Sequence, residues 1–350
     1  MKINHTLRRY FTTRLLHAND ERGTFPFSAL SVCMFGATGF LGEIMAHTFG
    51  QTGADIIFPH RINNHHNEYL KSLRLSAPLG SYYLYNGFDF ADPNSMVRAL
   101  KNCNVIVNMI GAKRNCRKYD DFYEANVEIP RRIAAHAKKQ GILRLIHFSA
   151  LGADLHSSSL DLATKAMGEQ AVRAEFPQAT ILRPGLILGF NDHFTFNFLK
   201  ASEFFWTFMP VYGNLSALRH PILETDVSRA AYNVLRLPDS AGQTYELGGE
   251  RVYSIKELYE VMINILQKPL KFIKFNRELA LTVSRFASWK YFSYLDLQKE
   301  EIDIVVTRKN GEKGIEDLFV KPGPIENFIN DSFYSYRQRI AFTKDDFNTL

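Results

Sequence analysis

The stretch 31–42, SVCMFGATGFLG, constrains the fold of this 350-residue chain more than any other. Residues 31–35 are a short apolar run that predicts a buried strand, and a helical pattern follows from 41 to about 49. Between them lie Gly36, Gly39 and Gly42, in the spacing G-x-x-G-x-x-G. Glycine spacing alone also fits an ordinary turn, but a strand before it and a helix after it favour a dinucleotide-binding unit.

Each glycine of this turn has a physical role in such a unit. Gly36 permits the tight turn out of the strand, Gly39 lets the backbone approach a pyrophosphate, and Gly42 lets the helix pack close to the sheet. The helix N-terminus then offers free N–H groups and a positive dipole end to phosphate. The turn therefore supplies six candidate cofactor contacts: Gly36, Thr38, Gly39, Phe40, Leu41 and Gly42.

Strand and helix patterns alternate along the first half of the chain. Strands are predicted at 31–35, 55–58, 79–85, 105–110, 143–148 and 180–182, and helices at 41–49, 121–139 and 160–175. Alternation at these intervals suits right-handed crossovers, so we expect an α/β fold with a Rossmann-type, doubly wound parallel sheet. We assign 26–190 to this domain, with 220–250 returning to it.

The remaining residues, 191–350, are expected to form a smaller, mostly helical interaction region. Residues 190–218 are rich in Phe and Trp, and we expect them to pack on a partner where an active relative would cover a substrate. A strand is predicted at 244–249, and a helix at 254–266 begins with a Ser254–Glu257 capping box. Residues 299–315 are charged and are expected to be exposed, and 325–339 predict a final helix.

Composition limits the class of protein. A net charge of +6 suits an acidic partner or an anionic lipid surface but does not indicate nucleic acid binding. Three scattered cysteines form neither a disulfide framework nor a zinc site, so we expect no metal, and Cys33 is expected to be a buried strand residue. The most apolar stretch, 194–215, carries Lys200 and Glu203, and no transmembrane helix is predicted.

The N-terminal segment has a composition of its own. Residues 1–19 hold four Lys or Arg residues and no Asp or Glu, with hydroxyl and apolar residues between them. A basic amphipathic segment without acids is typical of mitochondrial targeting, and we assign 1–25 to it. A basic surface arm is the alternative.

Four further residues are candidate cofactor contacts because of where the predicted strands end. Arg61 follows the second strand, where an acidic residue would accept the 2′-hydroxyl of NAD; a guanidinium there favours NADP through its 2′-phosphate. Asp89 follows the third strand, where it either reaches the adenine or caps a turn or helix. Ile110 and Gly111 end the fourth strand, where the backbone can pass over the cofactor.

These elements together resemble the extended and atypical short-chain dehydrogenase/reductase superfamily. The residues that carry the resemblance are GATGFLG at 36–42, NMIG at 108–111, ANVEIPRRIAAHA at 125–137, HFSALGA at 147–153 and LRPG at 182–185. A narrower likeness, through FPHR, HFSALGADLHSSS, KAMGEQAVRAEFP and GIEDLFVKPGPIENF, is to the alpha-subcomplex subunit 9 family, the NADPH-binding accessory subunits of mitochondrial complex I. It runs from about 31 to 342 and is strong over the first 185 residues.

The resemblance implies a cofactor site without its proton-transfer residue. An active member has a Tyr four residues before a Lys on one helix, where the Lys lowers the pKa of the Tyr. Here Lys165 is preceded at that spacing by Asp161, which is placed for a simple ion pair with Lys165. Lys165 is then expected to reach the nicotinamide ribose, although a solvated helix lysine is the alternative. Ser149 and Pro184 are further implied cofactor contacts. Without the Tyr, we expect the Ser149 hydroxyl to form a hydrogen bond at the end of its strand rather than to bind a substrate carbonyl.

The implied function is a non-catalytic NADPH-binding subunit of complex I, peripheral on the matrix side of the mitochondrial inner membrane. Its partners would be other subunits of the complex and, through a basic aromatic helix predicted at 275–297, lipid head groups. An ordinary core-facing helix is the alternative for 275–297. Two other functions compete: a soluble NADP-dependent reductase or epimerase that uses Tyr119 or Tyr123 as a substitute acid, and a nucleotide-free scaffold, which the intact glycines and Arg61 argue against.

Overall fold

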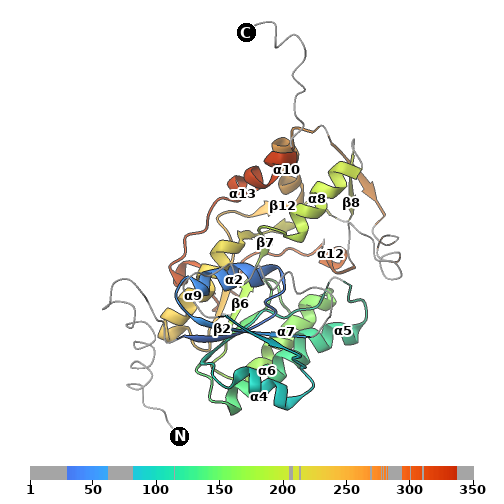
Figure 1. Ribbon diagram of the computed structural model, residues 1–350. Coiled ribbons are helices and arrows are strands. Elements are labelled where there is room, and N and C mark those ends of the chain that lie inside the picture. The colour runs from blue at the N-terminus through green and yellow to red at the C-terminus, as the bar shows by residue number, and fades with distance from the viewer. Residues whose placement is uncertain are drawn as a thin grey trace, which may run out of the picture.

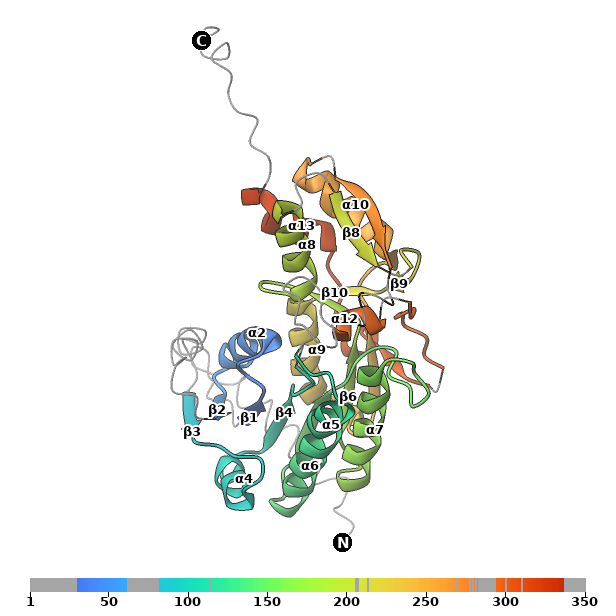
Figure 2. The ribbon, with the colours of Figure 1, turned by 90° about the vertical axis from the view of Figure 1, so that its right-hand side faces the viewer.

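The computed structural model describes residues 30–336 apart from 62–81, 114, 205–207, 213, 269, 277, 279, 281, 283–293, 300 and 310. The described residues build a parallel sheet with helices on both faces, and a second, smaller body beyond one end of the strands (Figures 1 and 2). The predicted targeting segment at 1–25 and most of the predicted helix at 275–297 lie outside the described residues.

Among the described residues, eight strands form one sheet in the order β14-β11-β6-β5-β4-β1-β2-β3, and every pairing is parallel. The order 3-2-1-4-5-6 within it is that of a dinucleotide-binding sheet, which confirms the predicted fold. The strands are β1 (Ser31–Phe35), β2 (Asp55–His60), β3 (Tyr82–Asn86), β4 (Val105–Asn108), β5 (Arg144–Phe148), β6 (Thr180–Pro184), β11 (Thr244–Leu247) and β14 (Lys313–Gly314).

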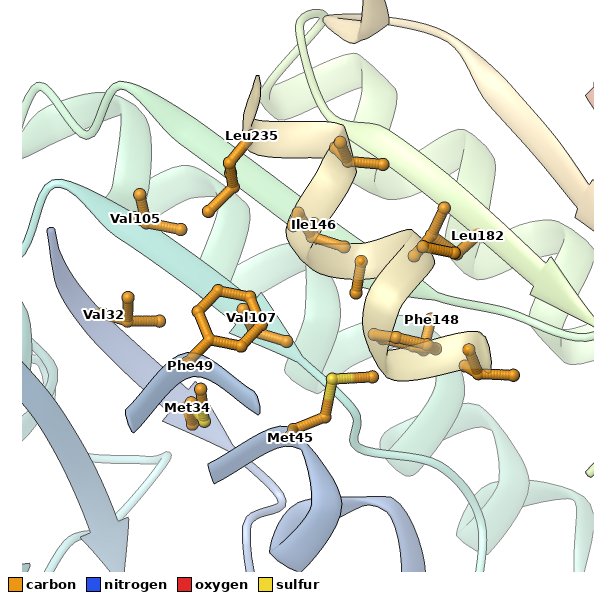
Figure 3. Packing of buried hydrophobic residues seen from close by; sticks show 14 of the residues in the cluster. Val32, Met34, Met45, Phe49, Val105, Val107, Ile146, Phe148, Leu182 and Leu235 are labelled. Carbon is orange, nitrogen blue, oxygen red and sulfur yellow. The ribbon is translucent and has the colours of Figure 1, made fainter. Parts of the chain in front are cut away.

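Alternate residues of the central strands feed two hydrophobic cores, because successive side chains of a strand point to opposite faces. Val32 and Met34 of β1 pack against helices α2 (Phe40–Gly50) and α9 (Glu224–Arg236) on one face (Figure 3). Cys33 and Phe35 face α4 (Pro93–Leu100), α6 (Ile129–Lys139) and α7 (Leu160–Glu175) on the other. The predicted burial of Cys33 is confirmed, since its exposed fraction is zero.

The helix predicted at 121–139 begins two residues earlier and contains a π-helical segment. It runs through α5 (Tyr119–Tyr123), the π-helix Glu124–Glu128 and α6. Pro130 has no N–H to donate to the carbonyl of Asn126, four residues before it, which disturbs regular α-helical bonding there. Gly168 of α7 packs against this carbonyl so closely that a Cβ would lie 2.0 Å from the oxygen.

The C-terminal part has a hydrophobic core of its own. That core is formed by α8 (His193–Phe204), β8 (Phe208–Tyr212), α10 (Ile255–Leu266), β13 (Lys271–Phe275) and α13 (Ile325–Phe333). The capping box of α10 is confirmed, with Glu257 N donating to Ser254 Oγ at 3.1 Å and Ser254 N donating to Glu257 Oε2 at 2.7 Å. Two short strand pairs, β7 (Leu186–Leu188) with β10 (Pro221–Leu223) and β9 (Leu218–Arg219) with β12 (Tyr253–Ser254), join this part to the sheet domain.

The expectation that 299–315 is exposed holds only in part, since Glu301, Asp303 and residues 307–309 are exposed. Ile304 and Ile315 are buried, and Ile304 N donates to Leu218 O at 2.9 Å, so the segment runs along β9. Lys299, at the end of α12 (Tyr294–Lys299), points into the protein rather than to solvent. The described ends of the predicted helix 275–297 belong to β13 and α12. Among the residues that the structure describes, no helix is long and apolar enough to cross a membrane.

Candidate functional site

A cavity of about 510 Å³ lies at the carboxyl ends of β1, β4, β5 and β6, between the sheet and the C-terminal part. This is the position at which open α/β sheets bind ligands. Nine of the residues predicted to contact a cofactor line it: Gly36, Gly39, Phe40, Leu41, Ile110, Gly111, Ser149, Lys165 and Pro184. The structure therefore brings together residues that are spread over about 150 positions of the chain.

The glycine turn forms one wall of the cavity and needs glycine for steric reasons. Gly36 has a φ of +85°, and a Cβ on it would lie 3.1 Å from the carbonyl carbon of Met109. Gly39 N donates to Gly36 O at 2.9 Å, which closes the turn. A Cβ on Gly42 would lie 1.8 Å from the carbonyl oxygen of Ala37, so this glycine is required by the backbone of the turn itself.

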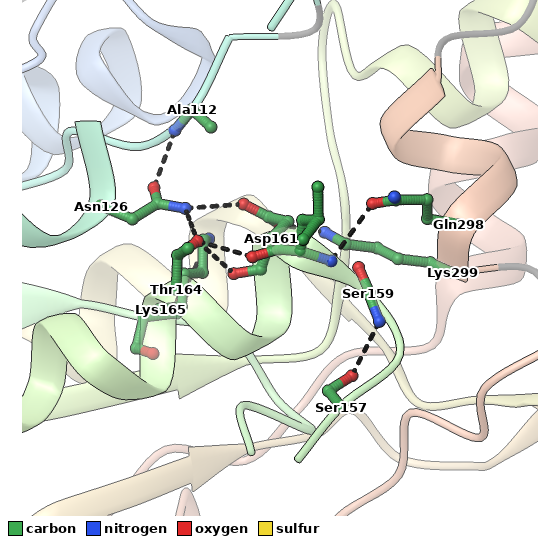
Figure 4. A network of polar contacts seen from close by, with 11 residues as sticks. Ala112, Asn126, Ser157, Ser159, Asp161, Thr164, Lys165, Gln298 and Lys299 are labelled. Atoms are coloured by element: carbon green, nitrogen blue, oxygen red, sulfur yellow. Dashed lines mark hydrogen bonds and ion pairs between the residues drawn. The ribbon is translucent and has the colours of Figure 1, made fainter. Parts of the chain in front are cut away.

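Asn126 ties the loop after β4 to α7 (Figure 4). Its Oδ1 accepts from Ala112 N at 2.9 Å, and its Nδ2 donates to Asp161 Oδ1 at 3.0 Å and to Thr164 Oγ1 at 2.9 Å. All three hydrogen bonds are made by the Asn126 side chain, and this residue is only 3% exposed. The π-helical segment thus places a satisfied buried amide where it can fix the loop that lines the cavity.

Asp161 is buried and pairs with Lys299, not with Lys165 as predicted. Lys299 Nζ lies 2.5 Å from Asp161 Oδ2, and Figure 4 shows the side chain of Lys299 reaching α7 from α12. Burial alone would raise the pKa of Asp161, but the charges of Lys299 and Lys165 and the hydrogen bonds from Lys299 and Asn126 lower it to about 2. Asp161 is therefore an ionised acceptor at neutral pH.

Lys165 and Ser149 lie together at the floor of the cavity. Lys165 Nζ donates to Ser149 O at 3.4 Å, and burial lowers the pKa of Lys165 while Asp161 opposes that effect. The hydroxyl of Ser149 is buried and has no hydrogen-bond partner among the described residues, so it does not act as the predicted strand-end hydrogen bonder. A buried hydroxyl that lacks a partner fits a site whose ligand supplies one.

The glycine cradle, the buried hydroxyl of Ser149 and the amine of Lys165 together fit a dinucleotide. The cradle admits a pyrophosphate close to the backbone, and Ser149, just after β5, and Lys165 of α7 face the same cavity. The described residues hold no cluster of His, Cys, Asp and Glu that could bind a metal ion.

Four predicted contacts do not line this cavity: Thr38, Gly42, Arg61 and Asp89. Arg61 follows β2 and lies over the ring of Phe90, 5.9 Å from its centroid. Asp89 Oδ1 accepts from Ala91 N at 2.9 Å. This hydrogen bond is the turn role that was predicted as the alternative to adenine contact. Tyr119 and Tyr123, the predicted substitute acids, stack on each other at 5.8 Å, are 46% and 36% exposed, and do not line the cavity.

The wall opposite the sheet was not predicted from the sequence. It is formed by α8, β8 and the start of α10, so the Phe-rich stretch lines the cavity as well as its own core. Asp192 immediately precedes α8, and its Oδ1 accepts from Thr195 N at 2.8 Å, which is the role of a helix-capping Asp. Glu224 Oε1 accepts from Phe190 N at 3.0 Å, and burial, with Asp192 and Glu43 nearby, raises the pKa of Glu224 to about 7.

Known proteins resemble this chain at two levels. Residues 32–248 match the NAD dependent epimerase/dehydratase family. NADH dehydrogenase (ubiquinone) 1 alpha subcomplex subunit 9 of Mus musculus is 32% identical over 314 residues, which cover 88% of this chain and 81% of the mouse protein. The NADH-ubiquinone oxidoreductase 40 kDa subunit of Neurospora crassa is 28% identical over 92% of this chain and 84% of its own length.

Solved structures also share the fold. The dTDP-glucose 4,6-dehydratase of Bacillus anthracis, solved in complex with NAD, superposes with a TM-score of 0.66 over 90% of this chain and 99% of that one. The two sequences are 17% identical, so this likeness concerns the fold alone.

Proposed function

This chain belongs to the alpha-subcomplex subunit 9 family of NADH dehydrogenase (ubiquinone), within the NAD dependent epimerase/dehydratase family, and on that premise we propose that it is a non-catalytic, NADPH-binding accessory subunit of mitochondrial complex I. We place it on the matrix side of the inner membrane, where it stabilises the matrix arm near its junction with the membrane arm. Its partners are the other subunits of the complex, and lipid head groups are a further expected contact through 275–297.

The proposed cofactor is supported by the geometry of the cavity. Gly36 and Gly39 leave room for a pyrophosphate beside the backbone, and Ser149 and Lys165 offer a hydroxyl and an amine to the same space. Arg61 after β2 favours a 2′-phosphate, and therefore NADPH, because a guanidinium binds phosphate bidentately. Bound NADPH would supply a hydride donor. The role of this chain's residues is to hold the NADPH in place.

The absence of catalysis is carried by one observation, the state of Asp161. In an active relative, the residue four before the Lys gives a proton to the substrate when hydride passes to a carbonyl. Asp161 has a pKa near 2, is 2% exposed, and has its oxygens bound to Lys299 and Asn126. It has no proton to give near neutral pH, and it does not line the cavity.

A bound cofactor would then stabilise the protein as a ligand. The cavity lies between the sheet domain and the C-terminal core, so a molecule in it contacts both. A ligand that binds the folded state and not the unfolded state adds stability in proportion to the logarithm of its excess over Kd. We infer that NADPH fixes the C-terminal part against the sheet and so presents one rigid surface to the complex.

The test is to purify the protein from mitochondria in mild detergent, then measure its nucleotide content and the mass at which it migrates. We expect about one NADPH per chain in a very large membrane complex, and no NADPH oxidation in a screen of carbonyl substrates. A small species that exchanges NADP(H) freely would contradict the proposal. Carbonyl-dependent NADPH oxidation that is lost in Lys165→Met would instead favour a reductase with a substitute acid.

A further inference from the structure

We propose that Phe319 is an anchor by which this chain binds another subunit of the complex, whose pocket is apolar inside and acidic at its rim. The contact surface, here called the Phe319 surface, consists of Phe319 and the cations Arg229, Arg236 and Lys321. The inference rests on the proposed function and adds to it a surface of the chain that contacts a partner.

The ring of Phe319 protrudes from a well-packed segment. Phe319 is 81% exposed, and no other large apolar side chain that the structure describes is more exposed. The residues on either side of it, Leu318 and Val320, are 0% and 6% exposed and belong to the hydrophobic core beneath α9. The chain therefore buries the two neighbours and turns the ring outward.

The backbone of Phe319 has a conformation that a bulky residue rarely adopts. Its φ is +55° and its ψ is 34°, in the left-handed region, and its N donates to Glu316 O at 2.9 Å. A Cβ makes this conformation unfavourable, whereas a glycine adopts it freely. A single exposed apolar side chain is common, but one on a strained backbone is not required by folding, since a glycine would form the same turn. Such outliers concentrate at binding sites.

The segment 318–323 is tied to α9 at both ends. Asn233 Nδ2 donates to Leu318 O at 2.8 Å, and Gly323 N donates to Asp226 Oδ2 at 2.8 Å. The two bonds hold the segment along about two turns of the helix. A ring on a fixed segment loses less conformational entropy when it binds than a ring on a mobile loop does.

Three cations lie close to this segment. On α9, Arg229 and Arg236 lie four residues before and three residues after Asn233, so both are within about one turn of the point where the segment is attached. Lys321 lies on the segment itself, and all three cations are exposed. Arg229 pairs with Asp226 at 3.4 Å, whereas Arg236 and Lys321 form no ion pair within the part of the chain that the structure describes.

The acidic side chains beside the ring are already occupied. Glu316 pairs with Arg308 at 2.7 Å, and Asp317 Oδ2 accepts from Gly314 N at 2.7 Å. Asp226 is buried and accepts from the segment itself. The cations therefore outnumber the available carboxylates at the Phe319 surface, which suits a partner with acidic groups around its pocket.

A protein pocket suits this surface better than a membrane. Binding to a membrane interface grows with the apolar area that enters it, and the segment exposes one large apolar side chain, because Leu318 and Val320 are buried. A pocket encloses a single ring on all sides, and a rigid aromatic residue surrounded by polar groups is the usual form of a binding hot spot.

The test is to import the radiolabelled full chain into isolated mitochondria and to measure, by native electrophoresis, the fraction that enters the large membrane complex. Phe319→Gly removes the ring and suits the left-handed backbone. It should lower this fraction at least about fivefold, while the unfolding midpoint of the purified protein stays equal or rises. Phe319→Asn also tolerates this backbone without the freedom of glycine, and it should give the same loss of assembly.

Matched variants separate the Phe319 surface from general effects. Phe190→Ala removes a ring that is 76% exposed elsewhere and should assemble like wild type. Arg236→Glu reverses a charge of the surface and should lower the assembled fraction by about twofold or more. Lys139→Glu, at the exposed end of α6 on the other face of the sheet, should leave it unchanged. NADPH content should be the same in all variants.

Equal assembly of wild type and folded Phe319→Gly protein, or an equal loss in Phe190→Ala, would overturn the inference. If Phe319→Gly lost binding to vesicles that contain cardiolipin but assembled normally, the partner would be a membrane and the inference would also fail. If the wild-type chain itself entered no large complex, the proposed function would fail, and this inference with it.

Discussion

Lys299 Nζ lies 2.5 Å from Asp161 Oδ2 and joins two residues that are 138 positions apart. The lysine comes from α12 in the C-terminal part, and the aspartate from α7 in the sheet domain. Asp161 is 3% exposed at its side chain and Lys299 21%, so the pair is largely removed from water. One buried ion pair thus connects α7 to the C-terminal part.

Removal of the lysine should be strongly destabilising. Lys299→Met removes the ion-pair partner of a buried carboxylate that keeps a hydrogen bond from Asn126 and the more distant charge of Lys165, and breaking a buried pair in this way costs about 3 kcal/mol. The measurement is the free energy of unfolding from denaturant titration. Lys256→Met, which removes an exposed pair with Glu260, is the control and should change stability by less than about 0.5 kcal/mol. If both variants lost similar free energy of unfolding, the buried Lys299–Asp161 pair would contribute no more to stability than an exposed pair.

The acid stability of the protein should depend on Asp161. Its pKa is about 2 in the folded protein and 3.8 as the ordinary value, so its contribution is full above about pH 5 and is lost as pH falls toward 2. The loss should reach about 1 kcal/mol by pH 3 and about 2 kcal/mol in full. The measurement compares wild type with Asp161→Asn between pH 5 and pH 3. If the difference in stability between the two proteins stayed constant over this range, it would contradict the lowered pKa of Asp161.

Glu224 should act in the opposite direction. Burial raises its pKa to about 7 from an ordinary value of 4.5, so the folded state holds a proton that the unfolded state releases. Its contribution is full below about pH 4.5 and is lost as pH rises through 7. The Glu224→Gln variant should therefore become more stable relative to wild type as the pH rises from 5 to 8. Thermal unfolding of both proteins measures this difference. Glu260→Gln, at an exposed position of α10, should show no such gain.

Two glycines with positive φ give a matched test of the turn. Gly141→Ala has open space around its Cβ, so it should cost only the left-handed backbone penalty of about 1 kcal/mol. Gly36→Ala has a similar φ and also meets the carbonyl of Met109, so it should cost more. It should in addition lower the amount of NADPH that co-purifies. If a folded Gly36→Ala protein kept its full NADPH content, the turn would not be part of the cofactor site.

The choice of cofactor should depend on Arg61. Charge-assisted hydrogen bonds contribute about 1.5–3 kcal/mol, so Arg61→Ala should weaken NADPH binding at least about tenfold and leave NADH binding nearly unchanged. Isothermal titration of nucleotide-free protein measures both. Arg98→Ala is a matched control, because Arg98 also lies 5.9 Å over an aromatic ring, that of Tyr85. An equal loss for NADPH and NADH would mean that Arg61 does not read the 2′-phosphate.

Local sequence patterns predicted the sheet domain well, because buried parallel strands are apolar throughout and end at turn residues. The strand Ser31–Phe35 and the helix Leu160–Glu175 have the predicted bounds. Nine predicted site residues meet in one cavity because the carboxyl ends of parallel strands lie at one edge of the sheet. Cofactor contact by these residues, and by Arg61 and Asp89, remains a prediction.

The sequence could not predict contacts made between distant segments. Nothing near Lys299 indicates that it leaves solvent for Asp161, and a run of charges such as 299–315 is ordinarily a solvated face. The same holds for Ile304, which its hydrogen bond to Leu218 of β9 places against Leu151 and Leu162. The spacing of Asp161 and Lys165 fits an ion pair on an isolated helix, and tertiary structure overrides it here.

The pairing of Asp161 with Lys299 also limits which side chains position 161 can hold. A tyrosine there would leave the ammonium of Lys299 and the amide of Asn126 without their shared acceptor, and would force a ring into a filled position. A phenol at this position would need compensating changes on α12 and in the π-helical segment. Position 161 is therefore locked by two distant segments, and no single substitution can free it without loss of stability.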